Sequence, residues 1–200
     1  MKIKLYYLTT VLLFLVGWND SFCQKPIFFS DTPDHYLIGK SILLLEDKKN
    51  EFELETVLDS SHLFKENTID LISLGLSSSS FWLKFNIQNN TSLPYLILVI
   101  DQPSLDFVEL YTQDANHTFS SLDIGEHKKF RERKYQHPVY LFDLDLAPHE
   151  SATFYLKVKG DEPIVLPISL ETPQDMVKLL SNKDMVMGIY LGGNVGDDFL

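Results

Sequence analysis

Hydrophobic and polar positions alternate most clearly in the middle of the chain, between residues 81 and 111. In the segment 81–87 (FWLKFNI), Phe and aliphatic residues fill every second position, which is the pattern of a strand with one buried face. The segment 105–111 shows a looser version of this alternation. The segment 95–101 (YLILVID) is apolar on both faces, so we expect it to lie centrally in a sheet.

Two short polar linkers separate these three segments. Residues 88–92 are rich in Asn, which tolerates the left-handed conformation, and residues 102–104 contain Pro103, which fixes φ. Both linkers are therefore suited to turns. We expect the three strands to form a β-meander with a buried centre.

Shorter apolar runs predict further strands on both sides of this centre. The run 164–170 (IVLPISL) contains Pro167, which has no N–H to donate, and this predicts an edge strand or a bulge. About eight short strands with regularly spaced turns favour an all-β fold, a jelly-roll-like β-sandwich over residues 26–170. The other predicted strands are 41–45, 139–144 and 151–158.

Four intervening segments have weaker patterns. Residues 52–57 alternate loosely, and residues 63–64 are apolar enough to start a short strand or a turn. The polar segment 112–129 predicts a long hairpin end or an exposed loop. The four serines at 77–80 predict a flexible connector, and the alternative is that their hydroxyls contact a sugar.

The composition narrows the possible classes of function. A hydrophobic content of 44% over 200 residues is enough for one domain with a true core. The net charge of −11 leaves no basic face for phosphate contacts, so we expect no nucleic-acid partner. The single cysteine, Cys23, permits neither a disulfide framework nor a cysteine-based zinc site.

Residues 1–23 have the pattern of a secretory signal peptide. Lys2 and Lys4 precede an apolar stretch, and small residues surround a cleavage position before Gln24. Lipidation of Cys23 is the alternative, which the charged and large residues just before it disfavour. We therefore expect export through a cleaved signal peptide.

The sequence contains no motif that predicts catalysis. Neither a Gly-x-Ser-x-Gly element nor a phosphate-binding glycine loop in a strand–helix context is present, so we expect a protein that is not an enzyme and has no cofactor. Asp143, Asp145, His149 and Glu150 surround one turn and could hold a structural calcium. Alternating Asp residues on a strand more often mark a solvated face, so we expect no metal there.

The segments FWLKF, the Asn-rich turn after it and LDFVELY together resemble a known family. The chain is similar to the extracellular sensor domain of bacterial 7TM receptors with diverse intracellular signalling modules, in the form called extracellular domain 2. One departure is a Pro-x-Glu turn where the family more often has Pro-Gly-Glu. Further matching features are the acidic pair Glu46-Asp47, Gly75, Arg133 and the turn at Pro148 and Glu150.

The resemblance implies a carbohydrate-binding-like β-sandwich that senses a ligand outside the cytoplasm. The implied partner is a small-molecule or saccharide ligand, and in full-length relatives the domain is fused to a 7TM bundle and a signalling module. The implied location is the periplasmic or extracellular face of the bacterial inner membrane. A non-catalytic protein-interaction domain at the cell surface is the alternative function.

A saccharide site combines an aromatic surface with planar hydrogen-bonding groups, because sugars present C–H faces and hydroxyl edges. For Trp82 the alternative is a core residue in the sandwich, and for Arg133 it is an ion pair with Glu132. The predicted ligand-binding residues are Trp82, Asp106, Glu109, Tyr111 and Arg133.

The C-terminal segment departs from the family. Residues 171–184 predict one or two helical turns, and residues 185–192 look like the start of a membrane helix that is too short to cross a bilayer. The predicted organisation is a signal peptide (1–23), a sandwich (24–175) and a tail (176–200). Three interpretations stay open: a free-standing sensor, a truncated receptor or a broken reading frame.

Overall fold

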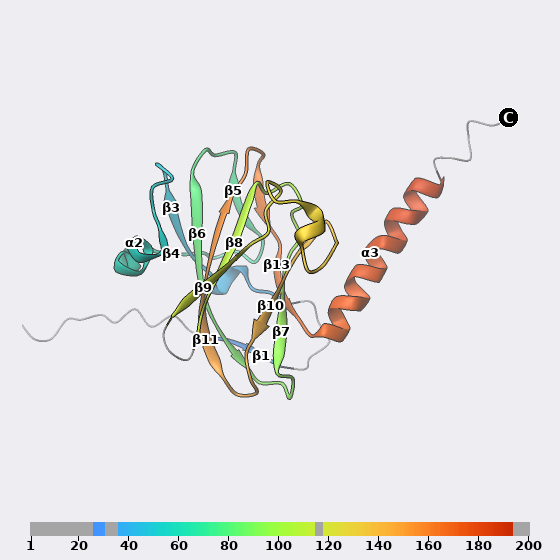
Figure 1. Ribbon diagram of the computed structural model, residues 1–200, viewed down its shortest axis with the longest axis horizontal. Helices are drawn as coiled ribbons and strands as arrows, with labels where there is room; N and C mark the ends of the chain where they lie inside the picture. Colours follow the sequence, from blue (N-terminus) through green and yellow to red (C-terminus); the bar gives the residue numbers. More distant parts are fainter. Residues whose placement is uncertain (1–25, 31–35, 115–117, 194–200) are drawn as a thin grey trace, which may run out of the picture.

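The computed structural model describes residues 26–30, 36–114 and 118–193. Two sheets pack face to face, with one helix outside each of them, and strands are the main regular elements of the described chain (Figure 1). The predicted all-β sandwich is therefore confirmed, whereas a jelly-roll connectivity stays a prediction. The predicted signal peptide and its cleavage position lie outside the described residues.

The first sheet has the order β4-β3-β6-β11-β8-β9, and β1 adds to β6 as a parallel neighbour. Its long central pair is β6 and β11, which run antiparallel over eight residue pairs. The strands are β1 (Ile27–Phe29), β3 (Leu43–Asp47), β4 (Lys65–Glu66), β6 (Ser80–Asn89), β8 (Phe107–Gln113), β9 (Phe119–Asp123) and β11 (Ser151–Lys159).

The second sheet has the order β10-β7-β13-β2, and a separate ribbon pairs β12 with β5. The predicted strands at 139–144 and 151–158 are confirmed as β10 and β11, and the one at 41–45 is confirmed two residues later as β3. The strands of these two units are β2 (Tyr36–Leu37), β5 (Ile72–Gly75), β7 (Tyr95–Ile100), β10 (Tyr140–Asp145), β12 (Ile164–Leu166) and β13 (Ile168–Glu171).

The predicted β-meander is wrong. The three strands exist, but β6 and β8 lie in the first sheet with β11 between them, and β7 lies in the second sheet. The reason is burial on both faces of β7: Leu96, Leu98 and Ile100 face the core, while Ile97 and Val99 lie in a separate apolar cluster under the C-terminal helix. Such a strand is stable only between two apolar layers.

The core lies between the inner faces of the two sheets. The side chains that alternate inward from β6 meet those of β11, and the rings of Phe85 and Phe154 stack with centroids 5.7 Å apart. Inward residues of β7, β10 and β13 close the core from the other side. The period-2 pattern of the sequence therefore identified the side chains that form this core.

Two segments between β3 and β4, whose sequence patterns were weak, form helical structure. Helix α2 (Leu54–Asp59) replaces the loose alternation at 52–57, because Leu54 and Val57 are three residues apart and share one buried helix face. Residues 61–63 form a 3₁₀ turn, η2 (Ser61–Leu63), so the turn interpretation of 63–64 is confirmed. Two further 3₁₀ turns are η1 (Gly39–Ser41) and η3 (Phe130–Glu132).

Helix α3 (Pro173–Gly193) is continuous and longer than the predicted one or two turns. The hydroxyl of Thr172 caps its start by accepting the Asp175 N–H at 3.1 Å. Its first turns pack through Met176, Leu179 and Leu180 on the second sheet, and Figure 1 shows the rest pointing away from the sandwich. No helix among the described residues is long and apolar enough to span a bilayer.

The segments 112–129 and 164–170 each contain strand residues. In 112–129 the edge strand β9 pairs antiparallel with β8, so the predicted hairpin end is confirmed and the exposed-loop alternative is wrong for residues 119–123. The run 164–170 is two strands, because Pro167 lies between them and has no N–H, while its carbonyl accepts the Asp101 N–H at 3.1 Å. The single edge or bulged strand predicted there is therefore wrong.

Asn89, at the end of β6, connects two separate turns. Its side chain is fully buried; the amide donates to the carbonyls of Leu93 (2.8 Å) and Leu146 (2.7 Å). Its Oδ1 accepts both the N–H (2.9 Å) and the hydroxyl (2.7 Å) of Thr91. Every polar atom of this side chain is thus used to join the two sheets at one end.

Replacing Asn89 with Ala is expected to lower the free energy of unfolding by about 3 kcal/mol, because buried carbonyls lose donors and Thr91 loses its acceptor. Urea denaturation followed by circular dichroism measures this change. Asn90→Ala is the matched control, since Asn90 is exposed and its backbone N–H, which bonds the Phe29 carbonyl, is kept. Equal losses in the two variants would contradict the role given to Asn89.

Candidate ligand-binding face

The outer face of the first sheet is divided into a covered half and an open half. Helix α2 and the side chains around it cover β3 and β6. Beyond the buried ring of Tyr155, the outward positions of β11, β8 and β9 are half-buried or exposed, and we call this part the open face. It is formed by Phe107, Glu109, Tyr111, Asp123, His127, Lys128 and Lys157.

Trp82 lies under the border between these two halves. Its side chain is 0% exposed, and its ring lies 5.3 Å from the ring of Tyr111. The Lys157 ammonium lies 5.1 Å from the Trp82 ring and donates to the Phe52 carbonyl at 3.1 Å. No hydrogen-bond partner for the indole N–H occurs among the described residues. Trp82 therefore packs beneath the open face and has no ring face free for a ligand.

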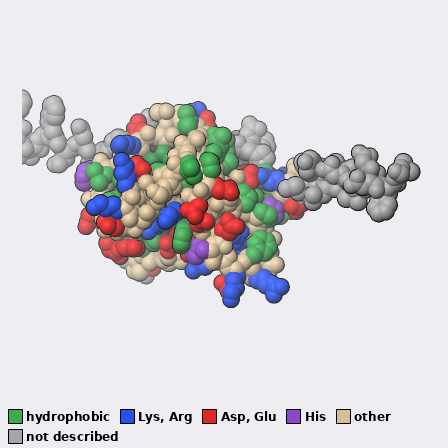
Figure 2. Space-filling model, turned by 90° about the horizontal axis from the view of Figure 1, so that it is seen from above, with side chains coloured by type: hydrophobic (Ala, Val, Ile, Leu, Met, Phe, Trp, Pro, Cys, Tyr) green, Lys and Arg blue, Asp and Glu red, His purple; other side chains and the backbone are tan. Residues whose placement is uncertain are grey.

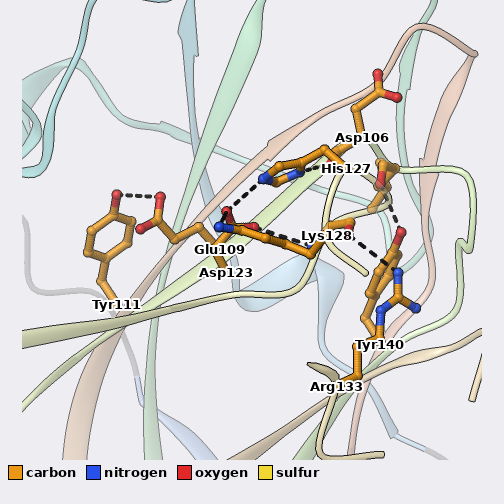
Figure 3. Close-up of polar contacts among 10 residues, drawn as sticks. Asp106, Glu109, Tyr111, Asp123, His127, Lys128, Arg133 and Tyr140 are labelled. Carbon is orange, nitrogen blue, oxygen red and sulfur yellow. Dashed lines mark hydrogen bonds and ion pairs between the residues drawn. The ribbon is translucent and has the colours of Figure 1, made fainter. Parts of the chain in front are cut away.

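Tyr111 and Glu109 are neighbours on the same side of β8. The Tyr111 hydroxyl donates to Glu109 Oε2 at 2.7 Å, as Figure 3 shows. Burial is the main cause that raises the pKa of Tyr111, and the hydrogen bond to Glu109 and its negative charge raise it further. The hydroxyl therefore stays protonated and holds the Glu109 carboxylate in place.

Asp123, at the end of β9, lies opposite Glu109 in the strand register. It pairs with His127 Nε2 at 2.8 Å and with the Lys128 ammonium at 3.4 Å. His127 Nδ1 lies 2.5 Å from the backbone carbonyl of Asp106, so both ring nitrogens face acceptors. Only the doubly protonated imidazole can donate to both of them.

Phe107 supplies an exposed aromatic ring beside these charges. Its side chain remains 43% exposed, and its ring lies 4.1 Å from the ring of His127 with a tilt of 32°. Figure 2 shows acidic, basic and apolar side chains intermingled on the surface seen from above. The open face thus joins one accessible ring to carboxylates and cations.

The turn 124–128 holds His127 in position, and it needs glycine. The N–H of Glu126 donates to the Leu105 carbonyl at 2.9 Å, and that of His127 donates to the Asp106 carbonyl at 3.3 Å. A Cβ on Gly125 would lie 2.2 Å from the Asp106 carbonyl oxygen, so no larger residue fits. Asp106 contributes its carbonyl to this turn, and Figure 3 shows its carboxylate pointing away from His127.

Arg133 lies on the other side of the same turn. Its guanidinium stacks 4.6 Å from the Tyr140 ring, and it donates to the carbonyls of Gly125 (3.4 Å) and His137 (3.5 Å). No ion pair between Arg133 and Glu132 is present among the described residues; Glu132 instead lies 3.8 Å from the Lys129 ammonium. The predicted ligand residues therefore separate, with Glu109 and Tyr111 on the open face, Trp82 beneath it, Asp106 at its border and Arg133 apart.

Five residues of the open face escaped the sequence analysis. Lys157 could have been found, because it alternates with the buried residues of the predicted strand 151–158. Asp123, His127 and Lys128 lie in a segment that was expected to be a long hairpin end or an exposed loop, and Phe107 was assigned to the apolar pattern of its strand. The pairing of β8 with β9 and β11, which brings these residues together, was not visible in the sequence.

The serines at 77–80 do not form a free connector. The Ser79 hydroxyl donates to Glu46 at 2.8 Å, and Ser80 is buried and donates to Asp47 at 3.4 Å. Asp47 also accepts the Phe52 N–H at 2.8 Å. The acidic pair that resembles the family therefore fixes the segments that lead into α2 and into β6 by hydrogen bonds.

Two of the four residues considered for calcium, Asp143 and Glu150, have other contacts. Asp143 accepts hydrogen bonds from Lys134 and from the Tyr135 hydroxyl, and Glu150 accepts the Ala147 N–H at 2.8 Å. Within the described ranges no group of three or more His, Cys, Asp or Glu side chains is arranged to hold a metal ion.

Comparison with known proteins places this geometry in a family. No curated protein matches the chain. The model of the family 7TMR-DISM extracellular 2 matches residues 39–172, more than half of the chain. This match starts at the turn η1 and ends just before α3, so it spans the open face, Arg133 and the second sheet. The chain therefore belongs to the 7TMR-DISM extracellular 2 family, a family of extracellular sensor domains of 7TM receptors.

Proposed function

We propose that this domain senses a saccharide, which it binds on the open face without chemical turnover. The observation that carries the proposal is the exposed ring of Phe107 next to Glu109, Asp123 and His127. An aromatic ring packs against the C–H face of a sugar, and the flanking groups reach its hydroxyls. Lys157 adds a cation on the neighbouring strand, opposite Glu109.

The charged groups of the open face are prepared for binding. Tyr111 holds Glu109, and His127 with Lys128 holds Asp123, so both carboxylates have fixed orientations before a ligand arrives. Fixed acceptors lower the entropy cost of binding.

In a receptor, the bound saccharide would shift the packing between the sandwich and the helix that leaves it. A ligand changes such an equilibrium only by binding one arrangement more tightly than the other. The contact between the second sheet and α3 provides two surfaces that could adopt different arrangements. The signalling module of the receptor would respond to that change.

Phe107→Ala is expected to weaken saccharide binding about tenfold, because the sugar loses its aromatic contact. A glycan array first identifies a ligand, and isothermal titration calorimetry then compares the variants. Phe28→Ala is the matched control, since Phe28 is an exposed ring on β1 outside the open face. If the folded wild-type protein binds no saccharide, the proposal is wrong.

Trp82→Phe is expected to lower the free energy of unfolding by about 1–2 kcal/mol and to leave saccharide affinity within about twofold. The ring is buried and its N–H has no partner among the described residues, so the change costs packing and no hydrogen bond. Thermal unfolding and calorimetry measure the two effects. A large loss of affinity in a stable variant would instead support the ligand-stacking role that the sequence analysis gave to Trp82.

A further inference from the structure

A small pocket opens at the side of the sandwich, separate from the open face. It has a volume of about 180 Å³ and lies where β9 and β10 form the adjacent edges of the two sheets. This volume is below the roughly 300–1,000 Å³ of pockets for drug-sized ligands, so its occupant must be small. The apolar part of its wall consists of Leu122, Ile124, Val139 and Leu141.

Arg133 is the polar group of this pocket, and its guanidinium has unused donors. Its Nε is buried and has no hydrogen-bond partner among the described residues. Its two hydrogen bonds, to the carbonyls of Gly125 and His137, are long at 3.4 and 3.5 Å. No carboxylate in the described ranges lies within ion-pair distance of it. A buried N–H without an acceptor carries a cost in free energy, even where the rest of the side chain is only half-buried.

The other charged groups of the pocket are already engaged. Lys134 pairs with Asp143, and the Tyr135 hydroxyl donates to the same carboxylate at 2.6 Å. Glu132 lies 3.8 Å from Lys129. Arg133 is therefore the one cation of the pocket lining without an ionic partner in the described residues, and Glu132 adds a single negative charge that disfavours a dianion.

We infer that this pocket binds a small monocarboxylate with a short apolar tail. The planar guanidinium matches a carboxylate in two parallel hydrogen bonds, which would use the remaining N–H of each Nη. The tail would pack on Leu122, Ile124 and Leu141. A neutral alcohol of the same length could fill the apolar part, but it would leave the guanidinium unpaired.

The pocket shares its wall with the surface on which α3 rests. Tyr135, Val139 and Leu141 line the pocket and also belong to the apolar cluster that contacts Met176 and Leu180. An occupant therefore contacts the same side chains that support the helix. Carboxylate binding should accordingly slow amide hydrogen exchange in the first turns of α3, in the part that begins at Pro173.

The test measures binding of acetate, butyrate and hexanoate to the folded protein by calorimetry and thermal shift, with 1-butanol and 1-hexanol as neutral probes. Butyrate or hexanoate is expected to bind, and Arg133→Gln is expected to weaken that binding about tenfold or more. Arg133→Lys keeps the charge without the planar fork and should lose part of the affinity. Arg131→Gln is the matched control, since Arg131 is exposed and outside the pocket lining.

Three results would overturn the inference: equal binding of acids and alcohols, no binding of any acid, or wild-type affinity in a folded Arg133→Gln. Circular dichroism of each variant establishes that it is folded. Phe107→Ala should bind butyrate as the wild type does, because Phe107 is not in the pocket. The saccharide proposal and the carboxylate inference can thus fail independently of each other.

Discussion

Strand β6 buries the whole of one face and, at Trp82, the first part of the other, and the rest of the domain is arranged to satisfy this constraint. Phe81, Leu83, Phe85 and Ile87 enter the main core, while Trp82 enters the outer cluster. A strand of this kind needs an apolar layer on each side. The second sheet provides one layer, and α2 with the side chains around it provides the other. Because α2 is short, it covers only part of the outer surface, and the open face is what it leaves uncovered.

The turn 124–128 links the two candidate binding regions. On one side His127 reaches Asp123 on the open face, and on the other side the Gly125 carbonyl accepts from Arg133 at the pocket. Gly125 lies so close to Asp106 that the turn has little freedom to shift without moving β8 as well. A displacement at either region would therefore reach the other through a few covalent bonds.

Local sequence pattern predicted the strands well and their partners poorly. The alternation at 81–87 and 151–158 follows from side-chain burial, which each strand carries in its own residues. Pairing depends on contacts between segments far apart in the chain, so the sequence could not show that β11 separates β6 from β8. The apolar residues on both faces of 95–101 correctly predicted a central strand that is covered on both sides. The outer cover is helix α3, and its neighbours in the sheet are not the two strands of the predicted meander.

Only those residues of the candidate site that lie on a single strand could be grouped from the sequence. Glu109 and Tyr111 share a side of β8 because they are two residues apart, a period that sequence reveals. Asp123, His127 and Lys157 join them only through strand register and a glycine turn. Arg133 was assigned to the same site by resemblance, and the structure separates it because the chain turns at Gly125 before reaching it. Burial of Trp82 likewise depends on α2, which the loose pattern at 52–57 did not predict as a helix.

The junction between β13 and α3 has a mechanical consequence. Only Thr172 separates the last strand from the helix, and β13 lies between β7 and β2 with a ladder on each side. Tension applied through the helix is therefore carried straight into the sheet, with no slack linker to absorb it. To yield, the strand must slide against both neighbours at once, which resists load far better than peeling from an edge. The C-terminal helix is therefore attached to a strand that is hydrogen-bonded on both sides.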